Sequence, residues 1–486
     1  MKNKLLILIP FLSLFTSCSD DITGLNADTK RPTYTEANYL FTNAEHAMVD
    51  QITSTSVNYN VFRLFSQQWT EVQYPQESQY DLTGRKIPDT HWTVLYRDVL
   101  RDYKESKDIL LKQKQNFTGS ASEAKVLNNK IAIIDILSAY TYSILVDTFG
   151  DIPYTEALDI INFPQPKYDD AQTIYKDLIS KLKTASNTLD QNYGSFGDAD
   201  LVYGGNASNW AKFANSLRLR LSINLDDVDH AYASAQVLSA ISDGIFTSSS
   251  DNTYMNYSST QPNANPLYVD LVASGRNDFV PANTFVNKLN TLSDPRRAKY
   301  FTEFTPGTYI GGVYGELNVY DNFSHITETV KAPEYPGVLL TYSEIQFLLA
   351  EAVERGIAVG GTAESHYNTA ITSSMSDWGV SSSDITTYLS RTDVAYSTAT
   401  GNWKRKIGEQ AWIALYNRGF EAWTSYRRLD FPVLNVPTVT YGDITEVPKR
   451  YSYPGAEETL NSTNLSSAVS KLGSNSVVKH IFWDKF

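Results

Sequence analysis

Cysteine is nearly absent from this chain, with one residue, Cys18, among 486. A single thiol excludes a disulfide framework within the chain, and it excludes the cysteine-rich ligand sets of structural zinc sites. This one thiol directly follows an apolar run near the start of the chain. Its use therefore has to be sought in the N-terminal segment.

Recognisable catalytic and metal-binding motifs are also missing. The six histidines include no pair at the i, i+4 spacing of a helix-borne zinc site, and no GxSxG, GxGxxG or P-loop sequence occurs. The acidic clusters at 198–200 and 226–229 carry oxygen ligands of the kind that calcium prefers, but they lack the full calcium-loop pattern. We predict that these clusters are solvated helix ends, that no cofactor is needed, and that the protein is not an enzyme.

Positive charge is in deficit, since 41 Lys and Arg stand against 54 Asp and Glu, giving a formal net charge of −13. No basic block is visible along the chain. Binding to phosphate groups requires concentrated Lys and Arg, so the composition argues against nucleic acid and against an anionic membrane face as partners.

Long apolar runs are absent after the N-terminus. The most apolar internal stretch, residues 131–146, contains Asp135 and several hydroxyl side chains. A membrane helix needs about 20 predominantly apolar residues. This stretch is therefore predicted to be a buried helix, and no membrane-spanning segment is expected in the mature chain.

The N-terminus has the layout of a lipoprotein signal. A basic start and an apolar run, Leu5–Leu14, too short to cross a bilayer, lead to Phe15-Thr16-Ser17 and then Cys18. An ordinary buried thiol is the alternative for Cys18, but acylation gives this isolated residue a use, and two or more acyl chains anchor a protein stably. The predicted division is a signal peptide over residues 1–17, a lipid-anchored tether over 18–32 and a domain over 33–486.

The main periodicity is that of amphipathic helices. In residues 209–225, apolar side chains recur at spacings of three and four, and Ser208 is placed to cap the helix. Similar helices are predicted over residues 35–52, 91–111, 124–146, 171–189, 231–241, 341–355, 364–375 and 404–427. Short Gly, Pro or Asp linkers join neighbours, as helical hairpins require. We predict a mainly α, solenoid-like bundle of hairpins, although no strict 34-residue repeat is present.

Three long inserts lack helical period: residues 62–90, 246–337 and 433–486. Long loops in compact domains are uncommon and often functional. These inserts mix polar residues with aromatic ones, in a chain that contains 32 Tyr, 21 Phe and 8 Trp. An aromatic plane packs on the C–H face of a sugar while Asp, Asn and Arg bind its hydroxyls, and peptide ligands use the same set. Most such residues serve packing, but we expect a few to line an exposed cleft.

Several short motifs follow one another in a specific order. They are Asp147–Leu158, Pro166–Tyr175, Asn209–Leu221, Asp294–Arg296, Leu340–Ala352, Phe420–Arg428 and Pro448–Pro454. Each is weak alone, but in this order and behind the lipoprotein signal they resemble the SusD/RagB family of nutrient-binding outer-membrane lipoproteins of Bacteroidetes. The residues after the lipidated cysteine, Ser19-Asp20-Asp21, resemble the acidic signal that directs such lipoproteins to the cell surface.

The resemblance implies a mainly helical fold in which four tetratricopeptide-like helix pairs support a loop-rich ligand face. It also implies an anchored outer-membrane protein, facing the cell exterior, that delivers an oligosaccharide, or in some members a peptide, to a SusC-like TonB-dependent transporter. The alternative from another class is a structural scaffold of the transporter complex that binds no small ligand. Among the motif residues, Arg218 and Glu344 are predicted to tie helices together.

No ligand-binding residue transfers by motif, because family binding sites share only their place in the inserts. Trp69, Tyr80 and Trp92 come first, since the insert after the first helix contributes to the site in relatives and Trp offers the largest stacking face. Arg and Asp side chains nearby are candidate hydrogen-bonding partners. The predicted ligand-binding residues are Trp69, Tyr74, Tyr80, Arg85, Trp92, Tyr268, Arg276, Asp278, Tyr309 and Tyr314.

Overall fold

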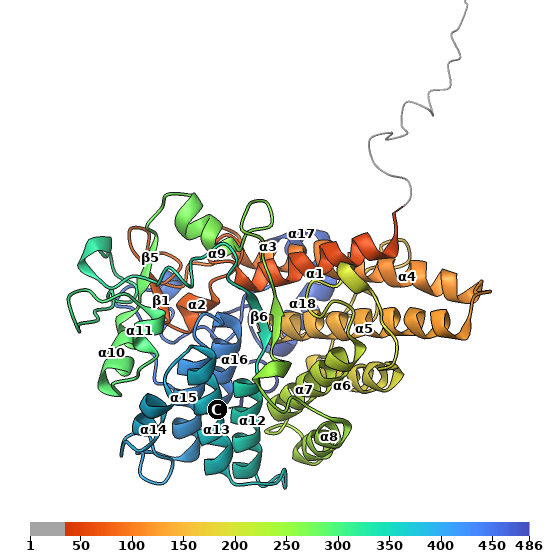
Figure 1. Cartoon of the computed structure of the whole chain (residues 1–486). Coiled ribbons are helices and arrows are strands. Elements are labelled where there is room, and N and C mark those ends of the chain that lie inside the picture. Colours follow the sequence, from red (N-terminus) through yellow and green to blue (C-terminus); the bar gives the residue numbers. More distant parts are fainter. Residues whose placement is uncertain (1–34, 486) are drawn as a thin grey trace, which may run out of the picture. The chain divides into compact units, whose positions relative to one another are not determined.

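The structure is a computed structural model that describes residues 35–485. The predicted signal peptide, the tether and Cys18 lie outside the described residues. Among the described residues, 37–485 belong to one unit of the fold. It begins with α1 (Ala37–Thr53), which lies beside α4 (Arg101–Gln115) in Figure 1.

Consecutive helices pack in pairs and build most of this unit (Figure 1). The pairs are α5 (Ala121–Phe149) with α6 (Ala171–Thr188), α7 (Ala207–Asn224) with α8 (His230–Asp243), α12 (Tyr342–Glu354) with α13 (Ala363–Asp377), and α15 (Trp403–Ala414) with α16 (Gly419–Leu429). The prediction of a mainly α fold built from tetratricopeptide-like hairpins with long inserts is confirmed.

Two local predictions about these helices are wrong. The helix expected over 404–427 is broken between α15 and α16, because Asn417 adopts a left-handed backbone with φ of 64° that an α-helix cannot contain. The cap of α7 is Asn206 rather than Ser208. The Asn206 side chain accepts hydrogen bonds from the backbone N–H groups of Ser208 and Asn209, at 3.0 and 3.1 Å.

The inserts and the connections between the long helices contain short elements that the sequence analysis does not predict. Two-stranded antiparallel pairs join β1 (Trp69–Glu71) to β5 (Phe279–Pro281), β2 (Ile152–Pro153) to β3 (Tyr168–Asp169), and β4 (Thr253–Met255) to β6 (Gly337–Leu340). The remaining helices are α2 (Phe62–Phe65), α3 (Ile87–Thr93), α9 (Pro266–Tyr268), α10 (Asn283–Thr291), α11 (Arg297–Tyr300), α14 (Ser382–Leu389), α17 (Gly455–Leu460) and α18 (Ser462–Leu472). Val94–Leu100 and Val269–Ala273 form π-helical turns, η2 and η5.

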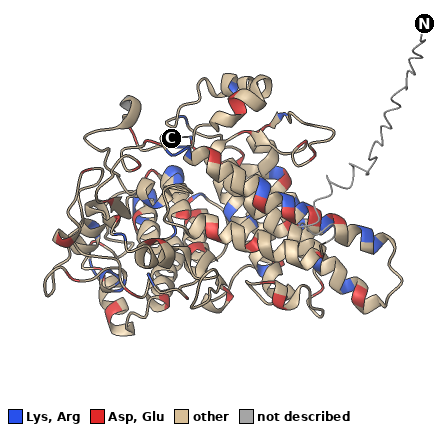
Figure 2. Ribbon diagram, turned by 90° about the horizontal axis from the view of Figure 1, so that it is seen from above, with Lys and Arg blue, Asp and Glu red and all other residues tan. Residues whose placement is uncertain are grey.

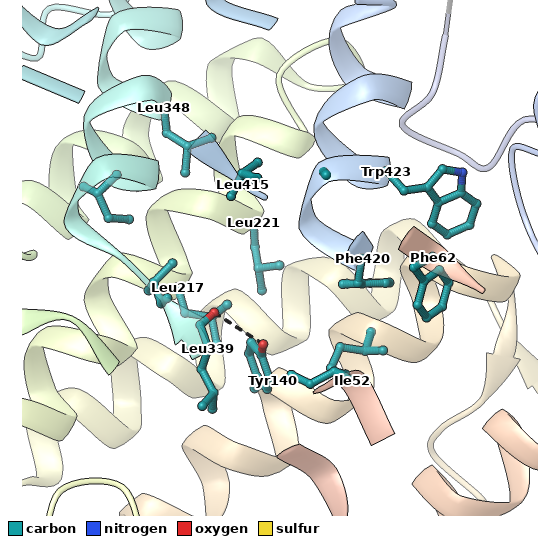
Figure 3. Packing of buried hydrophobic residues seen from close by; sticks show 14 of the residues in the cluster. Ile52, Phe62, Tyr140, Leu217, Leu221, Leu339, Leu348, Leu415, Phe420 and Trp423 are labelled. Atoms are coloured by element: carbon teal, nitrogen blue, oxygen red, sulfur yellow. Dashed lines mark hydrogen bonds between the residues drawn. The ribbon is translucent and has the colours of Figure 1, made fainter. Parts of the chain in front are cut away.

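The hydrophobic core lies where the helix pairs meet the inserts. In Figure 3, Leu217 and Leu221 of α7 point toward Tyr140 of α5, near Leu339 of β6 and Phe420 of α16. The predicted α7 stripe is confirmed as buried at Trp210, Phe213, Leu217, Leu221 and Leu225. Among the described residues, α5 is the one helix long and apolar enough to cross a membrane, and 78% of its apolar window is buried inside the protein.

Ion pairs made by buried arginines join helices to one another, as the sequence analysis predicts for Arg218 and Glu344. Arg218 binds Asp243 at 2.8 Å and thereby joins α7 to α8. Glu344 of α12 binds Arg220 of α7 at 2.6 Å and Arg418, next to α16, at 2.7 Å. These side chains fix helices to one another. On the ribbon as a whole, charges of both signs are interspersed (Figure 2).

The acidic clusters serve the fold rather than lying in solvent. Asp226 and Asp227 both bind Arg355, at 3.1 and 2.8 Å, and Asp226 is buried. Asp200, also buried, accepts hydrogen bonds from the Trp210 indole and from the Gly205 backbone. The expectation of solvated helix ends is therefore wrong for Asp200 and Asp226, whereas Asp198 is exposed and Asp229 caps the start of α8. Over residues 35–485, no group of three or more His, Cys, Asp or Glu is arranged to hold a metal ion.

Candidate functional site

Pairing of β1 with β5 brings the first two inserts together. The antiparallel register places Glu71, the last residue of β1, opposite Phe279, the first residue of β5, and the Val72 N–H donates to the Asp278 carbonyl at 2.9 Å. The chain just after β1 therefore meets the chain just before β5. Tyr74 of the first insert and Arg276 of the second line one cavity for this reason.

This cavity has a volume of about 260 Å³. Its wall combines three segments: the turn after α1, the end of β1 with the chain that follows, and η5 with the start of β5. The lining residues are Ser56, Val57, Asn58, Glu71, Gln73, Tyr74, Arg85, Asp270, Ser274, Arg276, Asp278 and Phe279.

A second cavity, of about 360 Å³, adjoins the first at Asp270. It lies between α1, the same turn and the chain around α9, and Tyr59 on its wall is exposed. We refer to the two cavities together as the Asp270 groove. The residues lining the second cavity are Ala47, Asp50, Gln51, Ser54, Tyr59, Val94, Asp98, Pro262, Ala264, Pro266, Val269 and Asp270.

Four of the ten predicted ligand-binding residues meet at the groove: Tyr74, Arg85, Arg276 and Asp278. The Tyr74 side chain is 53% exposed and so offers an open aromatic face. The Arg276 guanidinium binds the Asp278 carboxylate through two hydrogen bonds, of 2.5 and 3.0 Å. Arg85 pairs with Glu77. The structure thus places one stacking ring beside two oriented arginines.

The other aromatic candidates do not offer a face to a ligand. Trp69 is fully buried under the groove and donates its indole N–H to the Tyr416 hydroxyl at 3.2 Å. Tyr80, Tyr309 and Tyr314 are also buried, at 1%, 7% and 4% exposure. The expectation that these four rings are available for stacking is wrong, because they are packed inside the fold, Tyr80 edge-on against Phe65 and Tyr309 under Arg297.

The last two candidates are partly exposed but lie outside the groove wall. Trp92 packs edge-on against Phe149, at 5.0 Å between ring centroids, and lies 4.8 Å from Tyr96. Tyr268 ends α9 and precedes Val269, which lines the groove, without lining it itself. Neither ring is therefore brought together with Tyr74.

Asp270 and the turn after α1 are site elements that the sequence analysis missed. Buried Arg63 donates to the backbone carbonyls of Thr53 and Ser54, both at 2.8 Å, and so fixes the start of this turn. Asp270 accepts from the Ser54 hydroxyl at 3.3 Å, and burial raises its pKa. The available signal was the polar run between residues 53 and 60 that directly follows the first predicted helix.

Glu71 gives the groove a buried acidic wall. Its Oε2 accepts from the backbone N–H and the hydroxyl of Ser78, at 2.8 and 2.9 Å. Burial, and then the neighbouring Glu77, raise the pKa of Glu71 well above its usual value of 4.5. The folded protein therefore keeps the Glu71 carboxyl group protonated at a pH at which the unfolded chain releases that proton.

The raised pKa of Glu71 predicts a pH-dependent effect of Glu71→Gln on stability. The stability that protonated Glu71 contributes is lost as the pH rises from about 4.5 toward the raised pKa, whereas a glutamine has no proton to lose. We expect the melting temperature of E71Q, measured by circular dichroism from pH 4.5 to 8, to rise relative to that of the original protein as the pH increases. A melting-temperature difference between the two proteins that stays constant across this range would contradict the raised pKa of Glu71.

The chemistry of the groove is that of binding. Exposed Tyr59 and Tyr74 present ring faces, while Arg276, Asp278 and Asp270 present donors and acceptors at fixed positions. A ligand with both C–H faces and hydroxyl groups matches this combination.

The comparisons with known proteins place the chain in a family. Residues 29–454 match the model of a SusD-like family described as starch-binding and associating with the outer membrane. No match was found among curated proteins.

Solved structures share the fold over nearly the whole chain. A chitin-binding protein is 25% identical, with a TM-score of 0.80, over 93% of this chain and 100% of its own. A SusD homologue from Bacteroides uniformis is 24% identical, with a TM-score of 0.78, over 92% and 100%. A chitin-binding SusD homologue from Flavobacterium johnsoniae is 23% identical, with a TM-score of 0.77, over 92% and 99%. The chain therefore belongs to the SusD-like family of starch-binding proteins that associate with the outer membrane.

Proposed function

We propose that this protein binds an oligosaccharide in the Asp270 groove and delivers it to a SusC-like TonB-dependent transporter at the cell surface. The groove carries this proposal, because an exposed tyrosine lies beside a fixed arginine–carboxylate pair on a wall built from two separate inserts. The protein contributes binding and positioning, with no cofactor and no bond-breaking chemistry of its own.

The family description and one relative support a glycan as the ligand. The family is described as starch-binding, and the relative at 25% identity is a chitin-binding protein. Malto-oligosaccharides and chito-oligosaccharides are therefore the first probes. Both are uncharged chains of pyranose rings, which suits a groove whose arginines are already paired with carboxylates.

Titration calorimetry with three probes tests the proposal: maltohexaose, chitohexaose and a hexapeptide of mixed sequence. We expect one of the two sugars to bind with a dissociation constant in the micromolar range and the peptide not to bind. Binding of the peptide alone would replace the glycan by a peptide. The absence of binding by all three would favour the scaffold function.

The predicted anchor gives a separate test of delivery. Cys18→Ala removes the thiol to which the acyl chains attach, so we expect the protein to leave the membrane fraction and growth on the bound glycan to be lost. The affinity of the purified protein in solution should not change, because the groove residues lie far along the chain. Ser19→Ala is the matched control and should stay in the membrane fraction. A C18A protein that remains membrane-bound would contradict the anchor.

A further inference from the structure

A third cavity, of about 260 Å³, opens on another part of the fold and shares no lining residue with the Asp270 groove. Its wall is formed by β6, the start of α12, the end of α13 and the chain between α15 and α16. We call it the Trp378 cavity. Its lining residues are Ile52, Thr53, Tyr254, Thr329, Tyr335, Pro336, Val338, Thr341, Ser343, Ser374, Asp377, Trp378, Ala414, Tyr416, Asn417, Arg418 and Glu421.

Aromatic rings held in place by packing surround this cavity. Trp378 packs edge-on against Tyr300, with ring centroids 4.7 Å apart and an interplanar angle of 75°. Its centroid lies 6.4 Å from that of Tyr335 and 5.9 Å from that of Tyr416. Trp378, Tyr335 and Tyr254 are each partly exposed. Their rings therefore combine fixed positions with access from outside, as stacking on a ligand requires.

The polar groups of the cavity are also held in place. The Nδ2 of buried Asn252 donates to the Tyr254 hydroxyl at 2.8 Å and to the Asp377 carboxylate at 3.0 Å, while its Oδ1 accepts from the Tyr342 backbone N–H at 2.7 Å. Asn252 thereby fixes an exposed carboxylate beside an aromatic ring. On another wall, Arg63 fixes Asn417 through hydrogen bonds of 2.8 and 3.0 Å.

The charges in the cavity disfavour an anionic ligand. Arg418 is the cationic residue of the lining, and it is neutralised by Glu344 at 2.7 Å and Glu421 at 3.3 Å. A phosphate or a sugar acid would find no unpaired cation in this lining and would face Asp377. Thr329, Thr341, Ser343 and Ser374 also line this space. The hydroxyls of Thr341, Ser343 and Ser374 already make hydrogen bonds within the fold, with the Glu344 N–H, the Ala370 carbonyl and Arg296.

From these observations we infer that the Trp378 cavity is a second binding site, which takes one neutral sugar ring. The fixed aromatic rings suit the C–H faces of a pyranose, and Asp377 and Asn417 suit its hydroxyls. The cavity is of the size of a single ring rather than a chain. For a ligand of this size, the dissociation constant should be on the order of a millimolar.

Saturation-transfer NMR on the whole protein, with glucose and N-acetylglucosamine as separate probes and choline as a cationic probe, tests this inference. We expect transfer to at least one of the two sugars and none to choline. Trp378→Ala should weaken the sugar signal at least about tenfold. Asp377→Ala, at an exposed position that folding tolerates, should weaken it several-fold.

Tyr74→Ala, in the Asp270 groove, is the matched control and should leave monosaccharide binding unchanged. This test is independent of the oligosaccharide titration, because W378A should change the oligosaccharide affinity by no more than about twofold. Transfer to choline instead of the sugars would overturn the ligand class. Unchanged sugar binding in both W378A and D377A, or loss of the signal in Y74A, would overturn the site.

Discussion

Replacing Asp294 by alanine should lower the free energy of unfolding by roughly 3–5 kcal/mol, because it leaves a buried guanidinium without its counter-charge. Asp294 and Arg296 have fully buried side chains, joined by two hydrogen bonds of 3.0 and 2.7 Å. Burial alone would lower the pKa of Arg296, but the Asp294 carboxylate raises it above its usual value. Without Asp294 burial lowers the pKa of Arg296, but the guanidinium keeps its proton at neutral pH and stays charged in the variant.

Two neutral partners remain for Arg296 in D294A, Ser374 and Gln410, each at 3.1 Å, and neither compensates the charge. Urea unfolding of D294A measures the loss. Asp393→Ala is the matched control, because Asp393 pairs with Arg391 at the same spacing of two residues but with both side chains largely exposed, at 42% and 32%. We expect D393A to cost less than about 1 kcal/mol. Equal losses in both variants would show that burial does not set the strength of these pairs.

Tyr74→Ala should weaken oligosaccharide binding by about 2 kcal/mol or more, a factor of roughly thirty, if Tyr74 is the central stacking ring of the groove. The ring is 53% exposed, so its removal leaves little space unfilled in the core and the fold should persist. Arg276→Ala combined with Tyr74→Ala should weaken binding further, since Arg276 and Tyr74 line the same cavity.

Tyr39→Ala provides the control for Tyr74. Tyr39 lies on α1, is 69% exposed and lines none of the three cavities described above. Calorimetry of Y39A should give the original affinity within about twofold. Similar losses in Y39A and Y74A would show that binding does not depend on the groove ring.

Local periodicity was enough to predict most of the long helices. The spacing of Trp210, Phe213 and Leu217 reports a buried face directly, because neighbours on one face of a helix are three or four residues apart in the sequence. The cap of the same helix was missed because Asn206 and Ser208 are both good capping residues, and only the backbone conformation decides between them.

The site was harder to predict because its aromatic rings lie on segments without regular secondary structure. Trp69 and Tyr74 belong to the same insert and have similar aromatic character, yet one is buried and the other exposed. The difference comes from the pairing of β1 with β5, across more than 200 residues, which no local pattern encodes. The Arg and Asp candidates were placed better because Arg85, Arg276 and Asp278 keep partly exposed side chains. Asp294 and Arg296, in the same second insert, are fully buried, so charge alone does not predict exposure. Asp270 was missed for a similar reason. Its place in the site depends on contact with the turn after α1, which is distant in the sequence.

A crystal structure of the protein with the tightest-binding of the tested oligosaccharides would test the central claim most directly. The proposal predicts a sugar ring packed on Tyr74, with its hydroxyls within hydrogen-bond distance of Arg276 or Asp278. Continuous ligand density elsewhere on the molecule, with the Asp270 groove empty, would contradict it.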